Sequence, residues 1–552
     1  MLLIVAAVLI LVIGRGSTFF RDDWNFILFR RGHSAETLLR PHNGHSISLQ
    51  LILYKLLLQT AGLKTYVAYR AVSVVLHLLV AVLLFLFARR RVGPGVALAV
   101  TAVFVIPGAA SEVALWPTMY GFLGSIAAGI GALMALERGD RRGDLGACVL
   151  LVVALASSGV GVAVVAASSV LIVMGRDPRA RLVRVLAAPL LLYALWLLVY
   201  GGEVPPELVP ATESSVTDQP LKENIFDAPR YVANAASTAL AATVAVDSWF
   251  GPTLAIAAAA LLALRLRRPG ASPMLWALLA WALAYWGALA LTRGQFGGFD
   301  ASRYLYPGVA VSLLIGVEAM RGLRLSRRGL AFVAMAAAVV VVGNIGLMRD
   351  QGFALRVKGQ GLLAVLTALE LARDHVDPNF KPAPDDQSPA PDIVADRYFA
   401  AIDDFGSPAP SPAELAQRPD PERGLADTTL LQALRIQPST GEPVGALGPA
   451  PRIVGASLPG ARAEPGCVVT SPSPSEAATE LRLSSPAVAL RPRNGAAVEL
   501  RARRFADTFG DPFATVAGGT RAVLRFPADR SELPWHLEIR AGQSVRACGL
   551  MQ

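Results

Sequence analysis

The chain has 552 residues, of which 54% are hydrophobic and only 17% are charged, and its mean hydropathy is +0.48. Apolar runs recur until about residue 348, and runs of about 17–25 apolar residues are long enough to cross a bilayer as helices. These features exclude an ordinary soluble protein. The net charge of +10 does not indicate nucleic-acid binding, because most of the arginines lie in short loops between apolar runs, where they set membrane topology.

The apolar runs predict an all-α polytopic bundle of about eleven membrane helices. The first run has neither a basic start nor a small-residue cleavage site, so we interpret it as a membrane helix and not as a signal peptide. With five arginine clusters (89–91, 138–142, 176–184, 265–268 and 321–328) placed in the cytoplasm, the N-terminus is cytoplasmic and the tail extracytoplasmic. The expected spans are 1–20, 66–88, 96–110, 118–136, 144–157, 159–174, 183–200, 250–264, 272–291, 303–320 and 329–347.

Two further apolar stretches do not fit as crossings, because each would reverse the topology of everything after it. The stretch 46–63 carries Lys55 in its middle, so an in-plane helix on the outer leaflet suits it better. The stretch 231–249 is rich in small residues and only mildly apolar. A helix pair over 231–264 is the alternative.

A polar stretch, 21–48, follows the first helix and lies on the outer face in this topology. It begins with Asp22-Asp23-Trp24. Two adjacent carboxylates repel each other, so one of them can have a raised pKa and accept a proton. The structural alternative is a solvated anchor, with aspartate at a helix end and tryptophan at the membrane interface.

The same stretch contains "RPHNGHS", in which Asn43-Gly44 predicts a turn that presents His42 and His45 together. With Asp22 or Asp23 these imidazoles could form a metal site, although no dense metal-binding spacing is present. Alternatively, with Arg40 they could bind a phosphate or hold a carboxylate in a polar network. A purely structural role is the third interpretation.

Other unusual residues converge on the same outer side. Arg293 and Arg303 lie at the outer ends of two late helices; they either extend to lipid headgroups or bind a phosphate as guanidinium forks, with Tyr304 as a further donor. Trp116 could stack on a sugar or anchor the chain at the interface, and Glu112 supplies a carboxylate beside it.

The tail has a different composition. Residues 349–449 predict an amphipathic helix followed by an extended, partly disordered connector that is dense in proline and aspartate. From 450 to 552, apolar and polar residues alternate between turn signals, which predicts a small antiparallel β-sandwich. Cys467 and Cys548 bracket this domain and are expected to form a disulfide if the tail is extracytoplasmic; two buried free thiols are the alternative.

Taken together, residues 1–350 resemble the GT-C class of integral-membrane glycosyltransferases. The stretches "DDW", "HNGH" and "SRYLYP" are similar to those of poorly characterised bacterial members. The resemblance implies a plasma-membrane enzyme that moves a hexosyl or pentosyl group from a polyprenyl-phosphate donor to a cell-envelope acceptor. It implies that Asp22 or Asp23 is, or positions, the catalytic base, and that Arg293 and Arg303 meet the donor phosphate.

In that class some members bind a divalent metal at the first outer loop and others need none, so no cofactor is required by the resemblance. The rival hypothesis is a non-catalytic assembly factor or lipid transporter whose outer polar cluster binds headgroups. Geometry separates the two, because an enzyme requires Asp22 or Asp23, His42, Arg293 and Arg303 to line one outer cavity.

Overall fold

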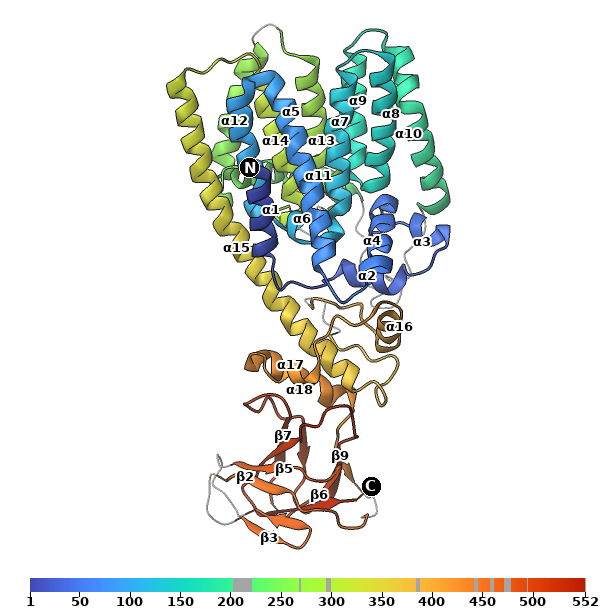
Figure 1. Ribbon diagram of the computed structural model, residues 1–552, viewed down its shortest axis with the longest axis vertical. Coiled ribbons are helices and arrows are strands. Elements are labelled where there is room, and N and C mark those ends of the chain that lie inside the picture. The colour runs from blue at the N-terminus through green and yellow to red at the C-terminus, as the bar shows by residue number, and fades with distance from the viewer. Residues whose placement is uncertain are drawn as a thin grey trace. The chain divides into compact units, whose positions relative to one another are not determined.

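The computed structural model describes residues 1–201, 221–267, 270–293, 299–383, 388–440, 445–456, 461–470, 478–493 and 495–551. The chain divides into two compact units, Met1–Arg356 and Val357–Gln552. Figure 1 shows that the first unit is a bundle of helices and that the second combines short helices with strands.

Helices make up the first unit. Short 3-10 turns, η1 (Gly108–Ala110), η2 (Pro117–Met119) and η4 (Ser248–Phe250), lie between some of them. The helices are α1 (Leu2–Ile13), α2 (Asp22–Phe29), α3 (Ala35–Leu39), α4 (Ser48–Ala61), α5 (Val67–Val105), α6 (Glu112–Leu115), α7 (Tyr120–Leu136), α8 (Arg141–Ser157), α9 (Val160–Val173), α10 (Pro178–Tyr200), α11 (Leu221–Thr243), α12 (Gly251–Arg267), α13 (Pro273–Arg293), α14 (Ser302–Ala319) and α15 (Arg327–Leu371), the last of which continues into the second unit.

Six helical segments among the described residues are long and apolar enough to cross a membrane: α5, η2 with α7, α10, η4 with α12, α13 and α15. Helices α1 and α9 are apolar but shorter. Several of the long helices expose large apolar side chains, such as Leu198 (82%), Ile256 (72%) and Val342 (70%). Because apolar faces of this size are unfavourable in water, they identify lipid-facing surfaces of a multi-pass membrane protein.

The first predicted arginine loop is a sharp break within α5, which covers the two spans expected at 66–88 and 96–110. Gly93 has φ 79° and ψ 168°, a backbone conformation that glycine adopts without strain, and Pro94 begins the second limb, where its missing N–H costs nothing. Beside the break, the buried guanidinium of Arg91 pairs with Glu318 of α14 and with Glu137, which follows α7. A buried charge is tolerated only when it is paired, so this cluster fixes three helix ends together.

The arginine cluster predicted at 176–184 also forms buried ion pairs that join helix ends. The carboxylate of Asp144 in α8 is 2% exposed and accepts from Arg181 and Arg184 of α10 at 2.8 and 2.9 Å. These ion pairs fix the start of α10 to the start of α8.

The two doubtful apolar stretches are both helical. In α4, Gln50, Leu51, Tyr54 and Leu58 are buried, while Lys55 points elsewhere and donates to the Gly32 carbonyl, which is the one-sided burial expected of a surface helix. The stretch 231–249, by contrast, belongs mainly to α11, which packs against α12, α13 and α14. It is a helix of the bundle, so the helix-pair alternative describes it better; the number of crossings stays a prediction.

In the second unit, the segment predicted to be an extended connector contains three helices, α16 (Ala395–Phe405), α17 (Pro412–Leu415) and α18 (Asp420–Ala433). The extended interpretation is wrong for these residues. Two of the prolines in this segment, Pro412 and Pro421, lie in the first turns of α17 and α18, where proline favours helix initiation. Buried Ala426, Leu430 and Ala433 then give α18 an apolar face.

The predicted antiparallel β-sandwich is confirmed. One sheet has the order β1-β9-β6-β11-β4-β3 and the other β2-β5-β10-β7-β8, and all pairings are antiparallel. Alternate residues are buried in β7, because one face of each sheet covers the core. The strands are β1 (Ser439–Thr440), β2 (Arg452–Ala456), β3 (Arg462–Glu464), β4 (Cys467–Val469), β5 (Ala478–Arg482), β6 (Ala487–Pro492), β7 (Val498–Arg503), β8 (Ala514–Val516), β9 (Ala522–Arg525), β10 (His536–Arg540) and β11 (Val545–Leu550).

The helices and the sandwich share one core. The end of α15, α18 and the inner sheet faces contribute to a single cluster of buried apolar residues. Asp427 of α18 accepts the backbone N–H groups of Arg504, Phe505 and Ala506, which follow β7. Burial raises the pKa of Asp427, although these three hydrogen bonds act in the opposite direction.

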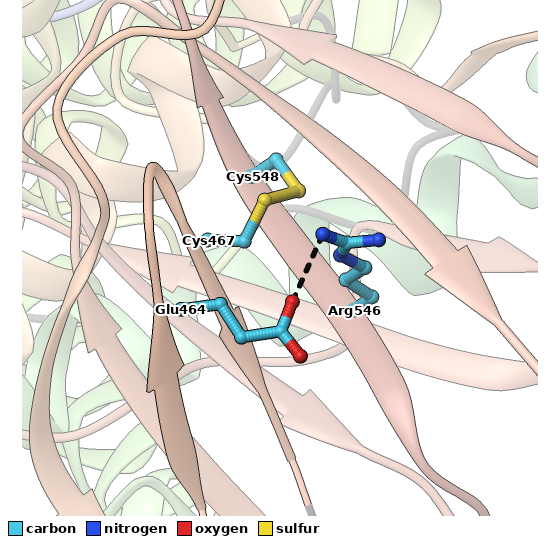
Figure 2. Close-up of a disulfide and its surroundings, with 4 residues drawn as sticks. All are labelled: Glu464, Cys467, Arg546 and Cys548. Carbon is cyan, nitrogen blue, oxygen red and sulfur yellow. Dashed lines mark ion pairs between the residues drawn. A yellow bond between two sulfur atoms is a disulfide. The ribbon is translucent and has the colours of Figure 1, made fainter.

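The predicted disulfide is present (Figure 2). Cys467 of β4 and Cys548 of β11 are directly opposite in the strand register, and their Cα atoms are 4.0 Å apart. Beside them Arg546 pairs with Glu464 at 2.9 Å. The bond joins residues separated by 81 positions, so it closes most of the sandwich sequence into one loop.

Candidate active site

The site begins where the chain leaves α1 and turns into α2. Arg21 has φ 44°, which is uncommon for a residue other than glycine. It precedes Asp22 and Asp23, which occupy the first turn of α2, where the helix dipole favours negative charge. Successive residues of a helix point about 100° apart, so the two carboxylates face different surroundings.

Asp23 is completely buried and is the centre of a hydrogen-bond network. Its Oδ2 accepts from the Phe20 N–H (2.9 Å), the Tyr66 hydroxyl (2.9 Å) and the Trp116 indole (3.1 Å), and its Oδ1 accepts from the Tyr54 hydroxyl (2.9 Å). Burial raises the pKa of Asp23 to about 7 against these hydrogen bonds. Because Asp23 joins α2, α4, the start of α5 and the segment before α7, it holds the loop that follows α1 on the bundle.

The predicted turn at Asn43-Gly44 is confirmed and forms a miniature hairpin. Asn43 and Gly44 both have positive φ (50° and 78°), and the backbones of His42 and His45 exchange two 3.0 Å hydrogen bonds. This is the geometry of a primed two-residue turn, for which Asn-Gly is the preferred sequence. The His42 ring meets Phe26 edge to face, with centroids 5.0 Å apart.

Asp22 and the hairpin line a cavity of about 150 Å³. One part of its lining is polar and holds Asp22, His42, Asn43, His45, Gln50 and Arg303. Another part is apolar and comes from the helices of the bundle, with Phe122, Val160, Ala163, Ala288 and Leu289. The cavity therefore offers charged groups and an apolar wall to the same ligand.

The electrostatics of Asp22 differ from those of its neighbour. Burial alone would raise its pKa, but hydrogen bonding and charge from His42, and then the charges of Arg303 and Arg21, outweigh burial and lower it. The His42 Nε2 atom lies 3.5 Å from the Asp22 Oδ2 atom. The lowered pKa favours the ionised carboxylate of Asp22, which faces the cavity with the His42 ring beside it.

Arg303 is held in the cavity wall by Glu112. The Glu112 Oε1 atom lies 3.3 Å from the Arg303 Nη1 atom, and Oε2 accepts the Arg303 backbone N–H at 3.1 Å. In the reverse direction, the Glu112 N–H donates to the Ser302 hydroxyl oxygen. Ser302 and Arg303 begin α14, so the Glu112 carboxylate caps the N-terminus of this helix although it comes from a distant part of the chain. Glu112 thereby fixes both the start of α14 and the position of the Arg303 guanidinium.

Not all the predicted residues reach this cavity. Trp116 is 3% exposed and donates to Asp23, so it is not the sugar-stacking surface that was one interpretation of it. Arg40 pairs with Glu36 one helical turn earlier and does not line the cavity. Tyr304 does line it, next to Arg303. Arg293 ends α13, but its side chain lies outside the described residues.

Several lining residues were not predicted. Gln50 bridges α4 to the segment before α7, because its amide donates to the Thr118 carbonyl and its oxygen accepts the Gly121 N–H. Gly159, in the tight turn between α8 and α9, lies against the His45 ring, and a Cβ atom there would come within 2.7 Å of Nδ1. Gln50 lies on the same helix face as the apolar residues Leu51, Tyr54 and Leu58, and this was a usable signal for it, whereas nothing local indicates that Gly159 lines the cavity.

The residues do not form a dense metal site. Among the described residues, no group of three or more histidine, cysteine, aspartate or glutamate side chains is arranged to hold a metal ion. Asp22 and His42 are close, but Asp23 is taken up by its four donors.

Comparisons with known proteins concern the fold. No family model and no curated protein matches the chain. The crystal structure of ArnT from Cupriavidus metallidurans bound to undecaprenyl phosphate is 14% identical, with a TM-score of 0.45 over 69% of this chain and 81% of that one. The apo state of ArnT gives 18% identity and a TM-score of 0.35 over 69% and 80% of the two chains.

An oligosaccharyltransferase from Archaeoglobus fulgidus, in complex with zinc and sulfate, is 15% identical, with a TM-score of 0.41 over 75% of this chain and 57% of that one. At these identities and TM-scores, the likeness carries no conclusion about the activity of this chain.

Proposed function

We propose that this chain is a membrane glycosyltransferase that moves a sugar from a polyprenyl-phosphate donor to a hydroxyl group of a cell-envelope acceptor on the extracytoplasmic side. The observation that carries the proposal is the convergence of Asp22, His42 and Arg303 on one cavity that also has an apolar wall. A scaffold that merely binds headgroups does not require a carboxylate, an imidazole and a guanidinium to meet around one small space.

In the proposed reaction, Asp22 acts on the acceptor and Arg303 acts on the donor. The acceptor hydroxyl attacks the anomeric carbon, and the bond from that carbon to the donor phosphate oxygen breaks. The Asp22 carboxylate accepts the hydroxyl proton as the hydroxyl becomes more acidic during attack. The Arg303 guanidinium stabilises the charge on the departing lipid phosphate, for which a planar fork is well suited.

Three neighbours support these tasks. His42 lies 3.5 Å from Asp22 and keeps its carboxylate oriented and ionised. Glu112 keeps the Arg303 guanidinium in place. The apolar wall, which includes Phe122 and Leu289, offers a surface for the first carbons of a lipid chain.

The test uses the full-length protein in lipid nanodiscs, supplied with labelled polyprenyl-phosphate sugars and envelope acceptors. Released lipid phosphate and labelled acceptor are measured. Asp22→Asn keeps the size of the side chain and removes its basicity, so transfer should fall about 10²–10⁴-fold. Glu36→Gln is the matched control, because Glu36 is a half-exposed carboxylate of the same polar stretch that does not line the cavity.

A binding measurement separates the rival hypothesis. Undecaprenyl phosphate, the lipid bound in the ArnT structure, is a suitable first probe. If the protein binds it through Arg303 but transfers none of the sugars tested, and Asp22→Asn changes nothing, the headgroup-binding hypothesis replaces the catalytic one.

A further inference from the structure

The outer face of the five-stranded sheet in the second unit carries a row of basic side chains. Four neighbouring strands each place one basic residue at the same level. Leu481, Leu537 and Ala502, which lie next to three of them in sequence, are buried in the core, so the basic side chains project from the opposite face. The row consists of Arg452 (β2), Arg482 (β5), His536 (β10) and Arg503 (β7), which are successive partners in the strand register.

The acidic residue beside this row neutralises only half of it. Glu480 accepts from Arg503 at 2.6 Å and from His536 at 2.7 Å through the same oxygen. In the part of the chain that the structure describes, no carboxylate lies within ion-pair distance of Arg452 or Arg482. Both of these side chains are exposed.

Arginines directly opposite each other on adjacent strands repel, which destabilises the sheet. Charges on an edge strand can be explained as protection against pairing with other sheets, and this would account for Arg452, because β2 is at the edge. It does not account for Arg482, because β5 is paired on both sides, with β2 and β10. Among the residues that the structure describes, no carboxylate supplies the counter-charge for this pair of arginines.

We propose that Arg452 and Arg482 form a binding site for a phosphate group on a partner outside this chain. Adjacent strands are about 4.8 Å apart, so two guanidinium forks can engage the oxygens of one phosphate or of two linked phosphates. Arg503 and His536, the other two members of the row, are held by Glu480. The phosphate is carried either by a lipid headgroup or by a phosphate-bearing solute of the envelope.

The experiment measures the binding of inorganic pyrophosphate to the full-length protein in nanodiscs of zwitterionic lipid by titration calorimetry. The variant Arg452→Gln/Arg482→Gln should bind about tenfold more weakly or worse, since each arginine contributes charge-assisted hydrogen bonds. Arg540→Gln is the matched control. Arg540 projects from the same sheet face but is paired with Glu538 at 2.7 Å, so its loss should change binding less than twofold.

A second arm repeats the titration in nanodiscs that contain phosphatidylglycerol. A loss of pyrophosphate binding there, for the unmodified protein, assigns the site to lipid headgroups, whereas unchanged binding assigns it to a solute. Equal binding by the unmodified protein and the double variant overturns the proposal. An equal loss of pyrophosphate binding in Arg540→Gln also overturns it, because binding would then depend on the overall positive charge of this sheet face and not on the two arginines. Undiminished transfer activity in the double variant leaves this site separate from the catalytic proposal.

Discussion

Two adjacent carboxylates, Asp22 and Asp23, have opposite roles in this site because they face different surroundings. Asp23 is buried and accepts hydrogen bonds from four donors, so we expect it to contribute to the stability of the fold. Asp22 faces the cavity, so we expect it to contribute to activity. Asp23→Asn replaces one acceptor oxygen with a donor, and we expect it to lower the free energy of unfolding by about 1–3 kcal/mol. Thermal unfolding in detergent, with Asp22→Asn as the control, measures this. Equal destabilisation by the two variants would contradict the division of roles.

Asp23 also predicts how stability depends on pH. Its pKa is raised by burial to about 7 from an ordinary value of 3.8. The native state therefore binds the proton more tightly than the unfolded state does, and this contribution to stability is complete below about pH 4 and is lost as the pH rises through 7. The unfolding midpoint of the unmodified protein should fall between pH 4 and pH 7. In Asp23→Asn, which cannot titrate, that part of the pH dependence should disappear; an unchanged slope would contradict the assignment.

Glu112 is the third residue whose role the geometry defines. It accepts both the backbone N–H and the guanidinium of Arg303, so it positions the group proposed to meet the donor phosphate. Glu112→Ala should raise the KM for the lipid donor about tenfold, with a smaller effect on kcat, because the loss is in binding. Glu112→Gln keeps an acceptor for the backbone N–H and should restore part of this loss. A fall in kcat alone, with KM unchanged, would assign Glu112 a different role.

At the scale of single elements, the disulfide between β4 and β11 is the feature most open to measurement. Closing a loop of this length should stabilise the sandwich by about 4 kcal/mol. Cys467→Ser/Cys548→Ser should therefore lower the unfolding midpoint of the second unit. Mass spectrometry of alkylated protein, with and without reductant, checks the bond itself. Two free thiols in protein recovered from an oxidising compartment would show that the bond does not form.

The elements that the sequence predicted well are those with a strong local signal. Hydropathy located most of the apolar helices, Asn43-Gly44 located the hairpin, and period-two alternation located the sandwich. The helices α16 to α18 were missed because their segment is dense in proline and aspartate, which suggested extended chain, although Pro412 and Pro421 lie in first turns, where proline favours a helix. For α11, small residues indicated weak membrane affinity, while in the structure they allow close packing against α13 and α14.

The candidate site was predictable only in part, for the same reason. Asp22, His42 and Arg303 were identified as unusual polar residues next to apolar runs, and the structure brings all three to one cavity. The choice between Asp22 and Asp23 depends on Tyr54, Tyr66 and Trp116, which come from three distant segments. The Tyr54 and Tyr66 hydroxyl groups that donate to Asp23 lie 31 and 43 positions away in the sequence, so no local pattern could predict these hydrogen bonds.

For the whole molecule, the decisive prediction is topology. The arginine clusters place the N-terminus and the loops near Arg91, Arg142 and Arg328 in the cytoplasm, with the tail outside. Reporter fusions after these three residues should therefore be cytoplasmic, and a fusion after Gln552 should be external. The disulfide depends on the same placement, because it forms in an oxidising compartment and is rare in the cytoplasm. A cytoplasmic signal from the C-terminal fusion, with external signals from the loops, would invert the bundle. The cavity with Asp22 would then face the cytoplasm, and an envelope acceptor could not reach it.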